Sequence, residues 1–81
     1  MLKIYGSMLC KDCVECREQL DAAGVEYTFY DFADDLKNLK TFLALRESEL
    51  FRLIREEGKI GIPCIVLEDD AVYLDWEPFL K

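Results

Sequence analysis

The first 30 residues constrain the fold most, because they read as a strand, a short loop, a helix and a second strand. Residues 2–5 are strand-like, and residues 25–30 alternate and are rich in aromatic and β-branched side chains. Residues 11–23 carry small or apolar side chains at helical spacing, and Gly24 supplies a C-terminal stop. A right-handed crossover through this helix makes the two strands parallel.

The rest of the chain predicts further helices and two more strands. Asp34 or Asp35 is expected to cap a helix with an apolar face, and Ser48 is expected to cap another helix that ends at Gly58. Strands are predicted over 64–67 and 71–74, followed by a final helical turn capped by Asp75. The order β-α-β-α-α-β-β-α predicts an α/β fold with a four-stranded mixed sheet flanked by helices. The length of 81 residues predicts a single domain, 1–81.

The pair Cys10-Lys11-Asp12-Cys13 lies where the loop meets the first predicted helix. Thiols three residues apart at a helix start lie one turn apart, close enough to form a disulfide. The unpaired N–H groups and the positive end of the helix dipole favour a thiolate there. In a β-α-β context the pair predicts a thioredoxin-like redox dithiol, with Cys10 as nucleophile and Cys13 as resolving thiol. The charge of Lys11 favours the thiolate, whereas that of Asp12 opposes it.

Two further cysteines leave a second class of function open. Cys16 is expected to be a small buried core residue, with an auxiliary thiol that exchanges with Cys13 as the alternative. Cys64 is expected to be a buried strand residue, with an approach to the site from the opposite side as its alternative. If both turned inward, four thiols would be available for Zn²⁺ or an iron–sulfur cluster. The three clustered thiols would then have to converge from one helix start, so the redox pair is favoured and no metal site is assigned.

Composition narrows the partners and the compartment. The formal net charge of −7 argues against nucleic acid or an anionic membrane as a standing partner. The chain turns polar too early for a signal peptide and has no apolar run of membrane-spanning length, so a cytoplasmic location is expected. Disulfides there are mostly transient and catalytic, and three of the four cysteines are spaced too closely to staple distant parts of a fold.

The strand at 2–5, the Cys10-x-x-Cys13 pair and the Ile62-Pro63 dipeptide together resemble the glutaredoxins of the thioredoxin-fold superfamily over nearly the whole chain. The resemblance implies that Pro63 is a cis-proline beside the cysteines and that the backbone of Ile62 pairs with a bound peptide or glutathione. The chain differs from typical glutaredoxins between the cysteines, where Lys11-Asp12 replaces Pro-Tyr. It also has Ser7 in place of Lys, and Gly61 where Thr is common.

The sequence therefore predicts a glutaredoxin-like thiol–disulfide oxidoreductase that reduces protein or glutathione mixed disulfides. The expected substrate-contacting residues are Lys11, Asp12, Ile62 and Pro63. No tightly bound cofactor is expected, and either glutathione or a thioredoxin-reductase-like flavoprotein is the expected source of electrons for a monomeric protein. A thiolate metal-binding protein on the same fold is the alternative, and a binding module without turnover is a third class.

Overall fold

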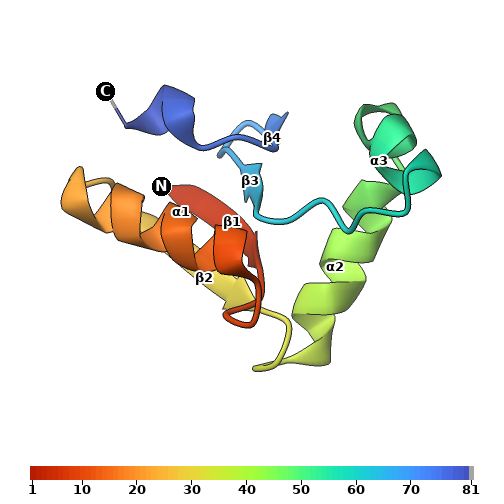
Figure 1. The fold of residues 1–81 in the computed structure, drawn as a ribbon, viewed down its shortest axis with the longest axis horizontal. Helices are drawn as coiled ribbons and strands as arrows, with labels where there is room; N and C mark the ends of the chain where they lie inside the picture. Colours follow the sequence, from red (N-terminus) through yellow and green to blue (C-terminus); the bar gives the residue numbers. More distant parts are fainter. Residues whose placement is uncertain (81) are drawn as a thin grey trace.

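The computed structural model describes residues 1–80 as an α/β fold with a four-stranded mixed sheet (Figure 1). The strands are β1 (Leu2–Gly6), β2 (Tyr27–Asp31), β3 (Cys64–Val66) and β4 (Val72–Tyr73). The α-helices are α1 (Lys11–Ala22), α2 (Leu36–Arg46) and α3 (Arg52–Glu56). A 3₁₀ turn, η1 (Glu49–Phe51), precedes α3, and a second, η2 (Glu77–Phe79), lies near the end of the described residues. No helix within residues 1–80 is long and apolar enough to cross a membrane.

The sheet has the strand order β2-β1-β3-β4. β1 runs parallel to β2, with Ile4 opposite Phe29, which confirms the parallel pair predicted from the crossover helix. β3 is antiparallel to β1, with Ile65 opposite Ile4, and β4 is antiparallel to β3. The parallel pair β1 and β2 is therefore joined to the antiparallel pair β3 and β4 through the two central strands, β1 and β3.

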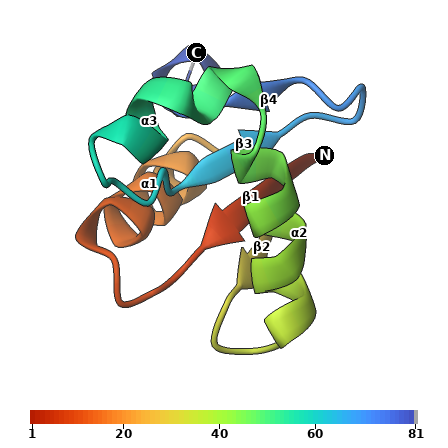
Figure 2. The ribbon, with the colours of Figure 1, turned by 90° about the vertical axis from the view of Figure 1, so that its right-hand side faces the viewer.

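Helices cover both faces of this sheet, α1 on one side and α2 with α3 on the other (Figures 1 and 2). Alternate residues of β1 and β3 point to opposite faces, as the pleat requires. Ile4 and Ile65 pack with Leu20 under α1, whereas Cys64 and Val66 pack with two buried phenylalanines, Phe42 and Phe51, under α2 and the turn that follows it. β3 is buried along its whole length because both of its faces are covered.

Local chemistry explains most helix boundaries. Asp35 caps α2, as predicted, by accepting a hydrogen bond from the Lys37 amide at 2.9 Å. Gly24, at φ +72°, takes the left-handed conformation that follows the end of α1. Asp75 accepts a hydrogen bond from the Glu77 amide at 3.2 Å at the final turn, which is a 3₁₀ turn.

Several predicted boundaries are wrong. The helix expected after Ser48 is a 3₁₀ turn followed by a five-residue α3, and the Ser48 side chain makes no capping bond. The second strand begins at Tyr27 and not at residue 25, because Val25 packs against the core under α1. The last strand spans only Val72–Tyr73 because it pairs with just two residues of β3.

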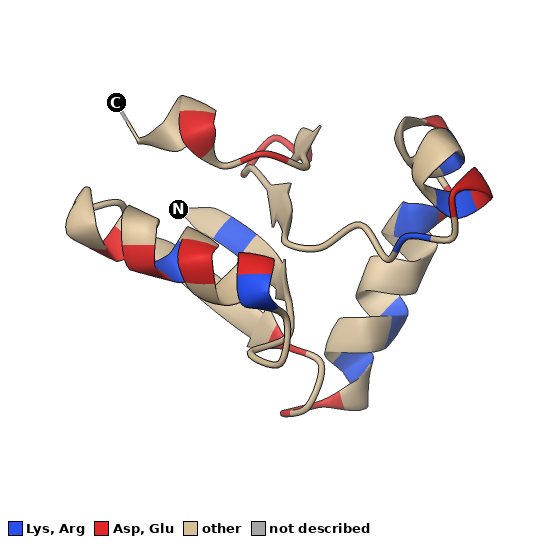
Figure 3. Cartoon of the chain, viewed as in Figure 1, with Lys and Arg blue, Asp and Glu red and all other residues tan. Residues whose placement is uncertain are grey.

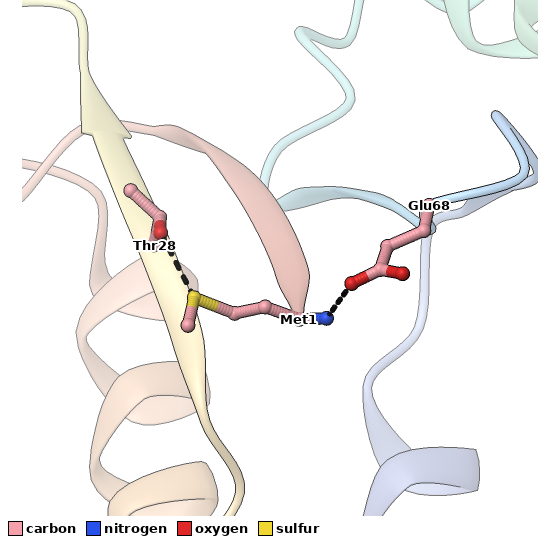
Figure 4. A network of polar contacts seen from close by, with 3 residues as sticks. All are labelled: Met1, Thr28 and Glu68. Atoms are coloured by element: carbon pink, nitrogen blue, oxygen red, sulfur yellow. Dashed lines mark hydrogen bonds and ion pairs between the residues drawn. The ribbon is translucent and has the colours of Figure 1, made fainter.

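Polar contacts of the first residue join the beginning of β1 to its neighbours (Figure 4). The amino group of Met1 forms an ion pair with Glu68, which lies in the turn between β3 and β4. The hydroxyl of Thr28 on β2 donates to the Met1 sulfur at 3.2 Å. Both contacts are exposed, so they contribute little to stability, and they mark the end of the sheet opposite the cysteines.

Candidate functional site

Cys10 lies at the N-cap of α1 and is partly exposed. Its amide donates to the Ser7 carbonyl at 3.0 Å, and its carbonyl accepts from the Val14 amide at 3.1 Å as the helix begins. The Ser7 hydroxyl accepts from the Leu9 amide at 3.1 Å, which folds the short loop. The Cys10 side chain makes no capping hydrogen bond, and the first N–H groups of α1 have no partner within the helix.

Cys13 lies one helical turn deeper and is completely buried. Burial raises the pKa of the Cys13 thiol to about 12. A hydrogen bond from the Ser7 backbone lowers this pKa, whereas the hydrogen bond and charge of Cys10 and the nearby Cys16 raise it further. The two thiols of the pair differ in access, because Cys10 is partly exposed and Cys13 is completely buried.

Gly6 makes room for the Cys13 sulfur. A Cβ atom at position 6 would lie 2.6 Å from the Cys13 Sγ, too close for any side chain. Gly6 is the last residue of β1, on the face that α1 covers, so the strand can approach the helix start closely. This role was not predicted from the sequence; the available signal was a glycine at the end of a strand, which can mark the close approach of another part of the chain.

A groove of about 380 Å³ adjoins Cys10. Asp12 lines it on the helix side, and the segment 58–62 that follows α3 lines it on the other, together with Ile54. The Ile62–Pro63 peptide bond is cis, as the resemblance predicted. Pro63 is buried behind the groove, and Lys11 is exposed but does not line it. The structure thus brings together Cys10, Asp12 and Ile62, with Cys13 beneath, and leaves Lys11 outside.

Arg46 holds the segment that forms the far wall of the groove, and Arg55 holds the chain where α2 ends. Arg46, at the end of α2, donates from Nε to the Ile60 carbonyl at 3.0 Å and from Nη2 to the Lys59 carbonyl. Arg55 donates to the Ser48 carbonyl at 2.8 Å and to the carbonyl of Arg46. Each guanidinium binds backbone carbonyls, a role that the charge pattern along the sequence does not predict.

The remaining cysteines do not join the pair in one cluster. Cys16 packs under α1 with Ile4 and Leu20, whereas Cys64 lies on the opposite face of the sheet beside Phe42. Burial raises the pKa of each of these thiols to about 11. Within residues 1–80 no three His, Cys, Asp or Glu side chains are grouped so as to hold a metal ion. The four-thiol arrangement required by the metal-binding alternative is therefore not formed, because the sheet separates Cys16 from Cys64.

A larger hollow, of about 620 Å³, lies away from the thiols beside β2. Arg17 of α1 stacks there on Phe29, with its guanidinium carbon 4.5 Å from the ring centre, and donates to the Tyr27 hydroxyl at 3.3 Å. Tyr27 in turn donates to Asp21 at 2.7 Å. The side chains of Arg17, Tyr27 and Asp21 in this hollow already bind one another, so its larger volume alone does not make it the candidate site.

Comparison with known proteins gives a relative of this chain. An uncharacterized protein of Haemophilus influenzae is 36% identical over 73 residues, which cover 89% of this chain and 85% of that protein. No protein-family model matches the chain, and no solved structure gives a significant match. The chain belongs to the same family as this uncharacterized protein of Haemophilus influenzae.

Proposed function

We propose that this protein is a thiol–disulfide oxidoreductase with a glutaredoxin-like thioredoxin fold, acting as a monomer in the cytoplasm. The observation that carries the proposal is the difference in burial between two thiols one helical turn apart: Cys10 is partly exposed at the N-cap of α1, and Cys13 is completely buried. The four free cysteines, three of them buried, suit a reducing compartment.

The proposed reaction transfers two electrons in two exchange steps. The Cys10 thiolate attacks one sulfur of a substrate disulfide, so that a Cys10–substrate disulfide forms and the other substrate sulfur leaves as a thiolate. Cys13 then attacks the Cys10 sulfur, its proton passes to a leaving substrate thiolate, and the second substrate sulfur is released. The substrate disulfide is reduced to one thiol, which carries the Cys13 proton, and one thiolate, which takes its proton from water, while Cys10 and Cys13 are oxidised to one disulfide.

The burial of Cys13 suits the second step. Its pKa of about 12 keeps it protonated while Cys10 is free, so it does not compete for substrate. When a mixed disulfide removes the charge and the hydrogen bond of Cys10, two of the causes that raise the Cys13 pKa disappear. The formation of the intermediate therefore lowers the pKa of the thiol that attacks it, while burial, the largest cause of its raised pKa, remains.

The arrangement of strands and helices also supports the proposal. A parallel β-α-β unit followed by two antiparallel strands is the order expected of a thioredoxin fold, and α1 starts from the end of central strand β1. Among the described residues, neither the amide nor the carbonyl of Ile62 has a hydrogen-bond partner. These two groups suit strand-like pairing with the backbone of a bound substrate.

The test compares cysteine variants in the reduction of a peptide mixed disulfide. Cys10→Ser is expected to abolish turnover. Cys13→Ser is expected to accumulate a covalent Cys10–substrate adduct, visible by mass spectrometry as the mass of the added substrate half. Cys16→Ala serves as the matched control, because it removes a buried thiol from the same helix and leaves the pair intact.

Retained turnover in Cys10→Ser, or a wild-type protein that reduces no disulfide, would overturn the proposal. The source of electrons is tested in parallel. Regeneration by glutathione with glutathione reductase is compared with regeneration by a thioredoxin-reductase-like flavoprotein and NADPH. The arm that sustains turnover of the wild-type protein identifies the reductant.

A further inference from the structure

Resting on the proposed function, we propose that the groove beside Cys10 selects extended protein segments with a branched apolar side chain next to the reactive cysteine, and rejects disulfides that carry carboxylates there. The occupant is thus a protein disulfide in a neutral or basic segment, and not a small anionic disulfide such as oxidised glutathione. Three features of the groove carry this inference: its apolar walls, its charges and the exposed residue before Cys10.

The side chains that shape the groove are mostly apolar. Ile54, Ile60 and Ile62 line it together with two glycines that add no polar group. Ile60 is 59% exposed although it sits on a segment that Arg46 fixes in place. Leu9, immediately before Cys10, is 95% exposed. Exposed apolar surface therefore lies on both sides of the partly exposed thiol. Covering that surface with a partner removes it from water and so favours binding.

The charges of the groove do not suit an anion. Its one lysine, Lys59, forms an exposed ion pair with Glu57 at 3.1 Å, so a carboxylate already lies beside this cation. The opposite wall carries Asp12, for which no ion pair is found within residues 1–80. Basic residues gather instead along α2, whereas α1 carries both signs (Figure 3). No arginine lines the groove, so no residue there offers a carboxylate the two-pronged binding that arginine provides.

The volume of about 380 Å³ fits this occupant. It is at the lower end of the range for small-molecule pockets, with room for one or two side chains of an extended segment. With the substrate cysteine at Cys10 and its backbone along Ile62, the neighbouring side chain would meet Ile60 or Ile54. A branched apolar side chain then buries surface on both partners, and a carboxylate there would meet Asp12.

The experiment uses matched peptides, each linked through its single cysteine to a coloured aromatic thiol whose release is followed by absorbance. The peptides differ only at the residue next to cysteine, which is Leu, Ser, Lys or Asp, and oxidised glutathione is a separate substrate. For the wild-type protein we expect kcat/KM for the Leu peptide to exceed that for the Ser peptide roughly ten-fold, equivalent to about 1.4 kcal/mol. The Asp peptide and oxidised glutathione should be the poorest substrates.

Two variants assign these preferences to the groove. Ile60→Ser should lower the ratio of kcat/KM for the Leu peptide to that for the Ser peptide from about ten toward one. Leu53→Ser is the matched control, because Leu53 is 62% exposed on α3 but does not line the groove, and it should keep the preference. Asp12→Lys should reverse the order of the Lys and Asp peptides.

The outcomes separate the two proposals. Equal kcat/KM values for the Leu, Ser and Asp peptides would overturn the selectivity and leave the oxidoreductase function standing. Faster reduction of oxidised glutathione than of the Leu peptide would do the same. Failure of the wild-type protein to reduce any of these disulfides would overturn both. An equal loss of preference in Ile60→Ser and Leu53→Ser would show that the groove does not carry the selectivity.

Discussion

Replacement of Gly6 by alanine tests whether the close approach of β1 to the buried thiol holds the site together. The added Cβ would lie 2.6 Å from the Cys13 Sγ, whereas the next nearest atom, Cζ of Phe29, lies at an ordinary 3.4 Å. Favourable contacts between non-bonded atoms occur at about 3.5–4.0 Å, so the sulfur or the strand must shift by nearly 1 Å. Overpacking of a buried site typically costs about 1–3 kcal/mol. We therefore expect Gly6→Ala to lower the free energy of unfolding by about 2 kcal/mol.

The same substitution should be harmless once the sulfur is gone. In a Cys13→Ala background the new methyl group occupies space vacated by Sγ. A glycine-to-alanine change without a clash stabilises a protein by about 0.4–1 kcal/mol, because the unfolded chain loses freedom. The sign of the effect should therefore reverse, with a coupling energy between the two sites of at least about 1.5 kcal/mol.

The assay is urea unfolding of wild type, both single variants and the double variant, all under reducing conditions so that no disulfide contributes. In a domain of this size a loss of about 2 kcal/mol also lowers the melting temperature by roughly 8–16 °C. Gly6→Ala should in addition prolong the life of the mixed disulfide, because Cys13 is pushed away from its line of attack. An equal cost of Gly6→Ala in the two backgrounds would refute the reasoning, since the cost would then not come from Sγ.

Three further outcomes follow from the structure. Gly61→Ala places a Cβ 2.9 Å from a Phe51 ring carbon, at a residue with φ +91°. Gly58 has a similar positive φ of +73°, but a Cβ there meets nothing within 4 Å. Urea unfolding should therefore show that Gly61→Ala destabilises the fold by about 1–3 kcal/mol more than Gly58→Ala. Arg46→Met removes two hydrogen bonds to the groove segment, so we expect KM for peptide disulfides to rise several-fold with kcat nearly unchanged. Arg46→Lys should restore part of the affinity. Burial in the folded state raises the pKa of the Cys16 thiol from 9.0 to about 11. Between these two pH values the unfolded chain has lost a proton that the folded chain keeps. The free energy of unfolding therefore falls as pH rises. Cys16→Ala should make that decline shallower, by at most about 1.4 kcal/mol per pH unit, in unfolding curves recorded from pH 8 upward.

The sequence predicted those parts of the fold that depend on local pattern. The strand before Cys10, α1 and the cap at Asp35 follow from alternation, helical spacing and capping chemistry, and all are found. The break of the predicted helix after Ser48 into η1 and α3 was not foreseeable, because Phe51 turns into the core under α2 and decides the local conformation. Tertiary packing overrides helix propensity in such short segments.

The residues of the site divide in the same way. Cys10 and Cys13 are recognisable because their chemistry depends on spacing within one segment. Gly6 and Arg46 act across the fold: Gly6 leaves space for a sulfur on another element, and Arg46 binds carbonyls 13 and 14 residues away. A hydrogen bond from a long side chain to a distant backbone leaves no pattern in one sequence. Arg46 therefore looked like any other basic residue on a polar helix face.

The conformation at Gly61 gives a physical reason for one difference between this sequence and the glutaredoxins that it resembles. Glutaredoxin-like chains commonly have threonine two residues before the cis-proline, but here the backbone has φ +91°, which β-branched residues avoid. The position also faces the Phe51 ring at 2.9 Å from where a Cβ would be, so even a small side chain would displace the packing under α2. Arg46 donates hydrogen bonds to the carbonyls of the two residues before Gly61. The side chains of Phe51 and Ile54 lie closest to Gly61 itself. The far wall of the groove is therefore held by residues of α2, η1 and α3 and not by the sheet, so substitutions of those that contact the segment, such as Arg46 and Ile54, should change substrate preference without changing the chemistry of the thiols.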